Sequence, residues 1–166
     1  MMPNNWDFLL HYGHRTNDTE LLEHVNTTLR RMAYGGIFDH VGGGFSRYAV
    51  DTKWHVPHFE KMLYDNAQLV SLYAKAYAFT KNVLYKEVVQ KTIAFVQEEL
   101  QSPNGGFYAS LDADSLNTEG VLHEGAFYVW EKEKLESLLK DDFEVFQTYF
   151  NINSYGLWEE DNSYVL

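Results

Sequence analysis

The chain has 166 residues, and hydrophobic side chains make up 45% of them, which is enough for a packed core in one domain. Its 13 basic and 24 acidic side chains give a net charge of −11, which argues against a nucleic-acid-binding surface and favours a neutral or cationic ligand. Because the chain contains no cysteine, a disulfide framework, a thiolate metal site and a cysteine nucleophile are all excluded.

The sequence shows neither a signal peptide nor a membrane span. The first residues, MMPNNWDFLLHYGHR, lack both a basic start and a sustained apolar run. No apolar stretch approaches the roughly 18 residues that a membrane-spanning helix requires. We therefore expect a soluble, cytoplasmic protein that does not bind membranes.

The first part of the chain contains two segments with apolar side chains at helical spacing. Residues 4–13 follow Pro3 and predict a short helix that ends at Gly13. From Asp18, a good N-cap, apolar side chains recur every three or four residues, and polar ones fall between them. This pattern predicts a helix with one apolar face that ends at Gly35.

Two further helices are predicted after a glycine-rich turn. Residues 57–80 are apolar around most of the helical circumference, so we expect this helix to be buried on both sides. Residues 84–100 carry lysine, glutamine and glutamate on one side, which predicts a helix with one exposed face. The alternation of the two kinds of helix predicts two concentric layers.

An internal repeat supports this arrangement. Glycine pairs at 35–36 and 105–106 each precede a strand-like stretch, a polar loop, a second aromatic stretch and then a tryptophan, Trp54 or Trp130. The predicted repeat units are roughly 18–80 and 84–150. Repeated helix pairs imply a solenoid or a closed ring, and six such pairs need roughly 400 residues. We therefore expect this chain to be a fragment of one larger ring domain.

The two glycine-containing segments also carry a family resemblance. The stretches GGGFSRYAVDTKWHVPHFEKMLYDNA and GGFYASLDADS, the latter followed by EGAFYVW, resemble a thioredoxin-domain-containing, spermatogenesis-associated family and its bacterial relatives. In that family a thioredoxin-like domain precedes an (α/α)6 toroid similar to those of N-acylglucosamine 2-epimerase and six-hairpin glycosidases. The resemblance covers nearly the whole chain. It implies an all-α fold, made of helical hairpins of an incomplete toroid with short β-hairpin insertions, without the thioredoxin-like domain.

Residues before the third predicted helix are the first candidates for chemistry. In a toroid the long turns meet at one mouth, which places His55, His58 and Glu60 around the helix start expected at Pro57. The positive end of a helix dipole disfavours a proton on imidazole, so a histidine there stays neutral and accepts a proton. Epimerisation beside a carbonyl and ring-opened isomerisation both require such a base.

A second titratable group is needed on the other side of the substrate. The candidates for this role are Asp51, Glu60, Asp112 and His123. Paired carboxylates at the appropriate separation suit glycoside hydrolysis instead. The alternative reading is structural, with these side chains accepting hydrogen bonds from the amides of the turns.

A metal site is a weaker alternative. His55 and His58 are three residues apart, with His40 and Asp51 nearby in sequence, but HVPH lacks the HExxH arrangement in which a glutamate activates water. The DADS stretch resembles the start of a calcium loop without its third acidic position and its glycine, so we expect it to form a turn. We predict no metal and no cofactor.

Aromatic side chains gather in the turns, where they suit either the apolar face of a sugar or the packing of short paired strands. Arg47 is placed either to hold a substrate carboxylate or to pair with Asp39 or Asp51. The predicted catalytic residues are His55, His58, Glu60 and Asp51, and the predicted substrate-binding residues are Arg47, Tyr48, Trp54, Asp112 and His123.

Two functions follow from these features. The first is binding of a carbohydrate or polyol, with epimerase-like or isomerase-like acid/base conversion. The second is a non-catalytic helical platform for a thioredoxin-like domain or another protein. A fragment of a ring exposes flanks that missing neighbours would cover, so we expect it to self-associate, to pair with the remainder of the full-length chain, and to be inactive alone.

Overall fold

The computed structural model describes residues 2–166 and divides into two compact units, Met1–Asp112 and Ala113–Leu166. About 51% of the chain is helical and about 15% lies in strands that form four small sheets. The protein is therefore mixed α/β, and the prediction of an all-α fold is wrong. Its strands are only two or three residues long, so they leave little alternation in the sequence by which to recognise them. The predicted repeat units stay a prediction.

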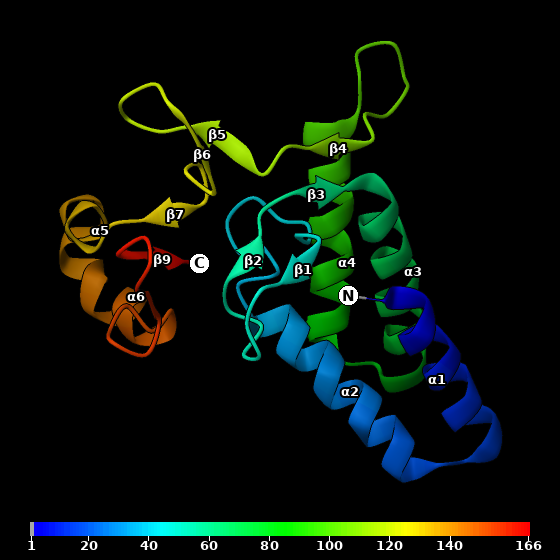
Figure 1. Ribbon diagram of the computed structural model, residues 1–166. Coiled ribbons are helices and arrows are strands. Elements are labelled where there is room, and N and C mark those ends of the chain that lie inside the picture. The colour runs from blue at the N-terminus through cyan, green and yellow to red at the C-terminus, as the bar shows by residue number, and fades with distance from the viewer. Residues whose placement is uncertain (1) are drawn as a thin grey trace. The chain divides into compact units, whose positions relative to one another are not determined.

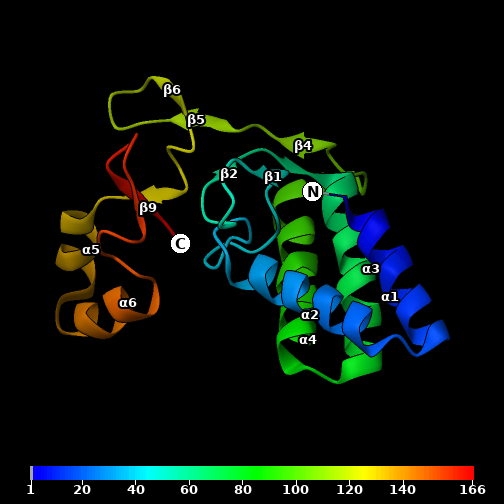
Figure 2. The same cartoon turned by 60° about the horizontal axis from the view of Figure 1, so that its bottom comes forward.

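The first unit is built on four helices that pack as two connected pairs (Figures 1 and 2). Helix α1 packs against α2 and α3, and α4 packs against α3 and α2. The connections within the pairs are two residues long, whereas the irregular segment between α2 and α3 is much longer. The helices are α1 (Pro3–Thr16), α2 (Thr19–Tyr34), α3 (Leu63–Thr80) and α4 (Val83–Phe95), which continues into a π-helical turn at Val96–Leu100.

The short connections have clear capping residues. Asp18 caps α2 by accepting a hydrogen bond from the Leu21 amide at 3.0 Å, as its position in the sequence predicts. Helix α1 runs past Gly13, so the predicted end is wrong. A Cβ atom at Gly13 would lie 2.9 Å from the side chain of Leu22. The glycine therefore permits close packing of α1 on α2 and does not end the helix.

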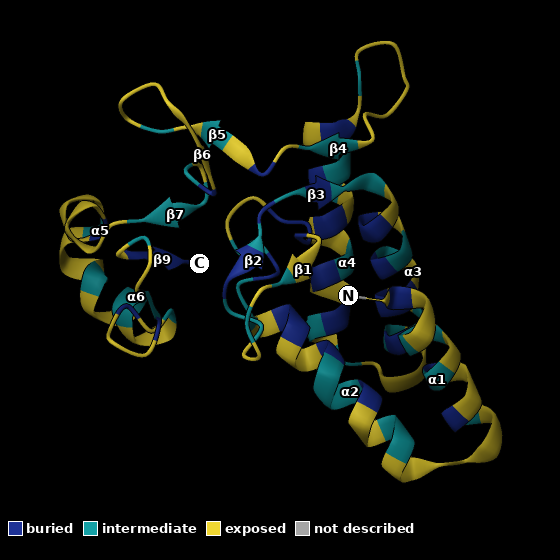
Figure 3. Ribbon diagram, viewed as in Figure 1, coloured by how far each residue is buried: buried dark blue, intermediate teal, exposed yellow. Residues whose placement is uncertain are grey.

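The core of the first unit lies between these helices and the turn that follows α2 (Figure 3). Aliphatic and aromatic side chains from all four helices contribute. Tyr73 is fully buried, and its hydroxyl donates to the Leu29 carbonyl at 2.8 Å. The buried side chains are Leu10, Val25, Leu29, Met32, Ala33, Ile37, Phe38, Phe45, Leu69, Leu72, Tyr73, Ala76, Tyr85 and Val88.

Two pairs of short strands border the helices in this unit. Strand β1 (Tyr48–Ala49) pairs antiparallel with β2 (Pro57–His58), and β3 (Lys61–Met62) pairs antiparallel with β4 (Ser110–Leu111). The start predicted at residue 57 for the third helix is therefore wrong by six residues. Residues 57–58 and 61–62 are paired in strands, and the helix begins only at Leu63.

The second unit has its own small core beneath short elements. Its helices are shorter than those of the first unit, and its β5–β6 hairpin is mostly exposed (Figure 3). Leu135, Ile152, Tyr164 and Leu166 form the centre of its core. The elements are β5 (Asp114–Leu116), β6 (Leu122–Glu124), β7 (Val129–Trp130), α5 (Lys132–Leu139), a 3-10 turn at Lys140–Asp142, α6 (Phe143–Tyr149), β8 (Leu157–Trp158) and β9 (Ser163–Val165), with the sheet order β7-β9-β8.

Within residues 2–166, every helix is too short or too polar to cross a lipid bilayer.

Candidate functional site

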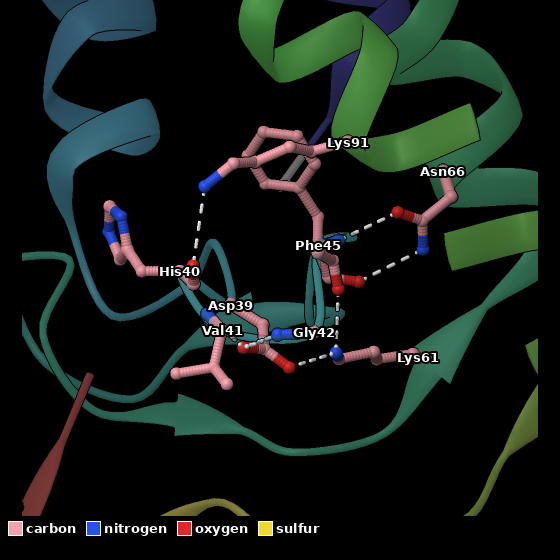
Figure 4. Close-up of polar contacts among 9 residues, drawn as sticks. Asp39, His40, Val41, Gly42, Phe45, Lys61, Asn66 and Lys91 are labelled. Carbon is pink, nitrogen blue, oxygen red and sulfur yellow. Dashed lines mark hydrogen bonds and ion pairs between the residues drawn. The ribbon is translucent and has the colours of Figure 1, made fainter. Parts of the chain in front are cut away.

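The glycine-rich turn after α2 is held by side chains from several elements (Figure 4). The Asp39 carboxylate accepts hydrogen bonds from the amides of Val41 and Gly42 at 2.9 and 2.8 Å. Gly43 and Gly44 both have φ of +78°, a left-handed conformation that side chains rarely adopt. The turn is thus a fixed structure in which two of the three consecutive glycines are required by conformation.

Lys61 of β3 also holds this turn in place, next to the Phe95 ring of α4. Its Nζ donates to Asp39 Oδ2 at 2.7 Å and to the Gly43 carbonyl at 2.9 Å, and it lies 4.6 Å from the centre of the Phe95 ring. The side chain is only 2% exposed. Burial lowers the pKa of Lys61, and the neighbouring Asp39 offsets part of this effect. This cation is committed to the fold.

Asn66, in the first turn of α3, holds the other side of the turn. Its Oδ1 accepts from the Phe45 amide at 2.7 Å, and its Nδ2 donates to the Phe45 carbonyl at 3.0 Å and to the Met62 carbonyl at 2.9 Å. A buried amide side chain that pairs with both the N–H and the C=O of a buried residue holds that residue in one position. We call Asp39, Lys61 and Asn66, together with the turn Gly42–Phe45 that they hold, the glycine clasp.

Asp51 organises the next turn along the chain. Its carboxylate accepts hydrogen bonds from the amides of Lys53, His55 and Val56, at 2.7, 3.1 and 2.8 Å. Burial tends to raise the pKa of Asp51, but these three hydrogen bonds lower it more, so the pKa lies below its usual value. In this geometry Asp51 is a turn-forming residue, and the predicted proton-transfer role has no further support from its contacts.

Four of the predicted site residues do come together, at the β1–β2 pair. Arg47 Nη1 lies 2.9 Å from Glu60 Oε2, and His58 Nε2 lies 3.8 Å from the same oxygen. The Tyr48 ring stacks on the His58 ring with their centroids 5.0 Å apart. Tyr48 and His58 are directly paired across the two strands, which explains the stacking.

The remaining predicted residues lie elsewhere. Trp54 adopts φ of +64°, and its carbonyl accepts from the Ile37 amide at 3.3 Å, so it joins the turn to the end of α2. His55 lies in the Asp51 turn, two residues before β2. Asp112 is exposed at the end of the first unit, and His123 is exposed in β6 of the second unit.

A cavity of about 270 Å³ opens beside the first turn of α3. Its volume lies just below the range for small-molecule sites, about 300 to 1,000 Å³. Two of the predicted binding residues, Arg47 and Tyr48, line it. The other lining residues are Met2, Pro3 and Asn4 at the start of α1, and Tyr64, Asp65 and Gln68 in α3.

Asp65 is the least expected residue of this cavity. It is only 5% exposed, and among residues 2–166 its Oδ2 is a buried side-chain oxygen without a hydrogen-bond partner. Burial raises the pKa of the Asp65 carboxyl, and the positive charges of the N-terminal amino group and Arg47 offset this only in part. Asp65 shares a helical face with Leu69, Leu72 and Ala76, all fully buried. An acidic residue on an apolar stripe was the sequence signal that could have identified it.

The histidines do not gather around a common point. Among the described residues 2–166, no group of three or more histidine, aspartate or glutamate side chains is arranged to hold a metal ion. His40, which the sequence places near His55 and His58, is instead beside Phe38, with ring centroids 5.4 Å apart. Burial lowers the pKa of His40, although hydrogen bonds with the backbone of Gly35 and Tyr34 partly oppose this.

Comparison with known proteins gives a consistent picture of ancestry. No model of a known protein family matches the chain. An uncharacterized protein of Caenorhabditis elegans is 39% identical over 165 residues, which cover 90% of this chain and 22% of that protein. Spermatogenesis-associated protein 20 of Homo sapiens and that of Mus musculus are 47% and 46% identical over 115 residues, which cover 69% of this chain and 15% of each relative.

The chain therefore spans only 15% to 22% of the length of these curated relatives. These matches support the predicted family resemblance, and the chain is similar to a segment of the spermatogenesis-associated proteins.

Proposed function

We propose that the cavity beside α3 binds a small carbohydrate or polyol. The observation that carries this proposal is the mixture of groups in the cavity wall. Tyr48 and Tyr64 supply aromatic surface, and Gln68, Arg47 and Asp65 supply hydrogen-bonding groups. Small-molecule sites combine apolar surface with a few polar groups in this way, and a polyhydroxylated ligand presents a complementary surface.

Acid/base conversion of the bound ligand is part of the same proposal. Asp65 is better placed for this role than His55 or His58, because it lines the cavity and neither histidine is among the lining residues. A carboxyl whose pKa is raised by burial holds its proton closer to neutral pH and can donate it to a ligand oxygen. Glu60 pairs with Arg47 and His58 stacks on Tyr48, and these contacts would orient the two wall side chains.

Calorimetric titration of the 166-residue chain with galactose, sorbitol and their amine derivatives tests this function. A ligand present at about ten times its Kd adds about 1.4 kcal/mol to the free energy of unfolding, so thermal unfolding provides a second readout. We expect Tyr64→Ala to weaken binding strongly, since Tyr64 lines the cavity. The matched control is Tyr34→Ala, which removes an exposed tyrosine from the end of α2, outside the cavity.

Equal loss of binding in both variants would contradict the assignment to this cavity. Absence of binding by every sugar and polyol at millimolar concentration would reject the function itself.

The second candidate is a non-catalytic platform for a thioredoxin-like domain or another protein. It is favoured by the glycine clasp and the Asp51 turn, where charged and polar side chains are occupied by structural hydrogen bonds. Exposed Phe127, Val145 and Tyr149 in the second unit offer apolar contacts. Sedimentation velocity of the chain alone, and mixed with a thioredoxin-like domain, tests self-association and this partner. A chain that sediments as a monomer and does not bind the added domain would exclude the platform function.

A further inference from the structure

Helix α6 of the second unit carries apolar side chains on two opposite faces. Phe143, Phe146 and Phe150 are partly buried and pack against the core of the unit. Val145 and Tyr149 lie four residues apart, and therefore on one face of the helix, and they are 75% and 69% exposed. A helix with one buried face usually presents polar side chains to solvent. The second apolar face of α6 therefore suits contact with another molecule.

Acidic side chains flank this exposed face. Asp141 and Asp142 are both exposed and lie four and three residues before Val145. At these spacings side chains are neighbours on a helix surface, and Asp142 is the N-cap residue of α6. We call Asp141, Asp142, Val145 and Tyr149 the outer face of α6.

The second unit as a whole is strongly acidic. Its residues 113–166 contain 12 acidic and 3 basic side chains, which give −9 of the net charge of −11 of the chain. Two of the three lysines have partners in or beside α5: Lys132 pairs with Glu136 at 3.7 Å, and Lys134 lies 5.4 Å from the centre of the Trp130 ring. The electrostatic potential over this unit is therefore negative.

This charge selects among possible occupants of the outer face. A second copy of the chain carries the same negative charge and would be repelled. Nucleic acid and anionic lipid are repelled for the same reason. A protein segment that combines apolar side chains with lysine or arginine matches both the apolar surface and the charge, since complementary potentials favour association.

We propose that the outer face of α6 docks a basic amphipathic helix of another protein. This inference rests on the second candidate function, the non-catalytic platform, and names the chemistry of its partner. The apolar side chains of the partner contact Val145 and Tyr149, and its cations lie near Asp141 and Asp142. Tyr149, whose ring lies 4.9 Å from that of Phe150 between their centres, provides the aromatic anchor typical of protein interfaces.

Three peptides test the chemistry of the partner. The first is a helical peptide of leucine and lysine with all leucines on one face. The second has glutamate in place of each lysine, and the third has the composition of the first in shuffled order, which keeps the charge and removes the apolar face. In fluorescence anisotropy titrations of the 166-residue chain at pH 7, we expect the first peptide to bind about tenfold more tightly than either of the others. Added salt should weaken its binding.

An apolar variant tests the location. We expect Tyr149→Ser to weaken binding of the leucine–lysine peptide about tenfold, because it removes the aromatic anchor. The matched control is Tyr34→Ser, which removes an exposed tyrosine at the end of α2 in the first unit and should leave the affinity unchanged. Because both side chains are exposed, thermal unfolding should show that both variants remain folded.

A charge variant tests the acidic side chains separately. Asp141→Asn combined with Asp142→Asn should weaken binding of the same peptide about threefold at low salt. Its control is Glu20→Gln combined with Glu87→Gln, which removes two exposed carboxylates from the first unit and changes the net charge by the same amount. We expect the control pair to have a smaller effect than the Asp141 and Asp142 pair.

Each outcome has a separate meaning. Equal binding of the lysine and glutamate peptides would overturn the choice of a basic partner, and equal binding of the shuffled peptide would overturn the role of the apolar face. Full affinity in Tyr149→Ser, or equal effects of the two charge variants, would overturn the assignment to α6. Failure of all three peptides to bind would reject this inference, whereas sedimentation with a thioredoxin-like domain judges the platform function independently.

Discussion

The two glycine-containing segments of the chain are similar in sequence pattern but differ in their surroundings. In the first segment, a Cβ atom at Gly43 would lie 2.7 Å from the Lys91 carbonyl oxygen, and one at Gly44 would clash with the Phe95 ring. In the second segment, no heavy atom lies within 4 Å of a Cβ atom placed on Gly105 or Gly120. Backbone conformation alone explains why Gly105 and Gly120 are glycines. At Gly43 and Gly44, close packing against α4 is a second reason.

The polar side chains of the two segments differ in the same way. In the first segment Asn66, and Asp39 in addition to its local bonds, bond to residues more than 20 positions away. Asn117 of the second segment accepts hydrogen bonds from the amides of Glu119 and Val121, at 3.0 and 2.9 Å, within one exposed turn. The first segment is therefore stabilised by tertiary contacts and adjoins the cavity, while the second is stabilised locally.

The largest difference is expected for alanine at the two kinds of glycine. Gly44→Ala combines a left-handed φ with a clash against Phe95, and we expect a loss of about 4 kcal/mol in the free energy of unfolding. Gly105→Ala has only the conformational cost, about 1 kcal/mol. Urea denaturation measures both, and equal losses would show that packing on α4 is not what distinguishes the segments.

A similar contrast is expected for the two lysine–carboxylate pairs. Lys61→Met leaves Asp39 without its buried counter-charge, and we expect a loss of about 3 kcal/mol. Lys132→Met breaks an exposed pair with Glu136 in α5, and its effect should stay within about 0.5 kcal/mol. If the Lys61 variant unfolds at the same urea concentration as wild type, the glycine clasp does not stabilise the unit.

The two asparagines provide a smaller contrast. Asn66→Ala leaves the buried amide and carbonyl of Phe45 without partners, which should cost about 2 kcal/mol. Asn117→Ala exposes amides that water can reach, and we expect less than about 1 kcal/mol. Denaturation of both variants under the same conditions decides this, and a larger loss at Asn117 would reverse the ranking of the two segments.

The smallest effect is the pH dependence of the stability that Asp51 contributes. The pKa of Asp51 is lower in the folded protein than in the unfolded chain, so its ionised form stabilises the fold at pH above about 4, and this contribution is lost as pH falls through the folded pKa. Asp51→Asn should therefore cost about 1 kcal/mol at pH 7 and much less at pH 3. Asp114→Asn, in β5 of the second segment, is the control variant for this test.

Unfolding free energies at the two pH values test this expectation. A loss at Asp51 that does not change with pH would show that hydrogen bonding to the ionised carboxylate is not its cause.

Sequence reasoning predicted α2, the helix that begins with a cap and ends with a glycine. Asp18 and Gly35 bound α2 as expected, because both signals act locally. Gly13 misled the prediction of α1, since its role is contact with Leu22, a residue on another helix. The predicted helix start at residue 57 was wrong because the strands there are set by pairing with distant residues.

The candidate site could be predicted only in part, because part of it also depends on contacts between residues distant in the sequence. Arg47, Tyr48, His58 and Glu60 were selected by residue type, and they lie together because the β1–β2 pair aligns them. Asp65 was missed, since what distinguishes it is burial without a partner, which depends on the packing of α3 against its neighbours. Chemistry that depends on residue identity is legible in a sequence, and chemistry that depends on burial requires the fold.

The hydrogen bonds between Phe45 and Asn66 also bear on motion. They join residues 21 positions apart, so the segment between them is a closed loop whose opening need not unfold the four helices. The Phe45 amide proton reaches solvent only when this loop detaches from α3. Its rate of exchange with deuterium, compared with those of amides inside α4, will therefore report whether the loop beside the cavity opens as an independent unit.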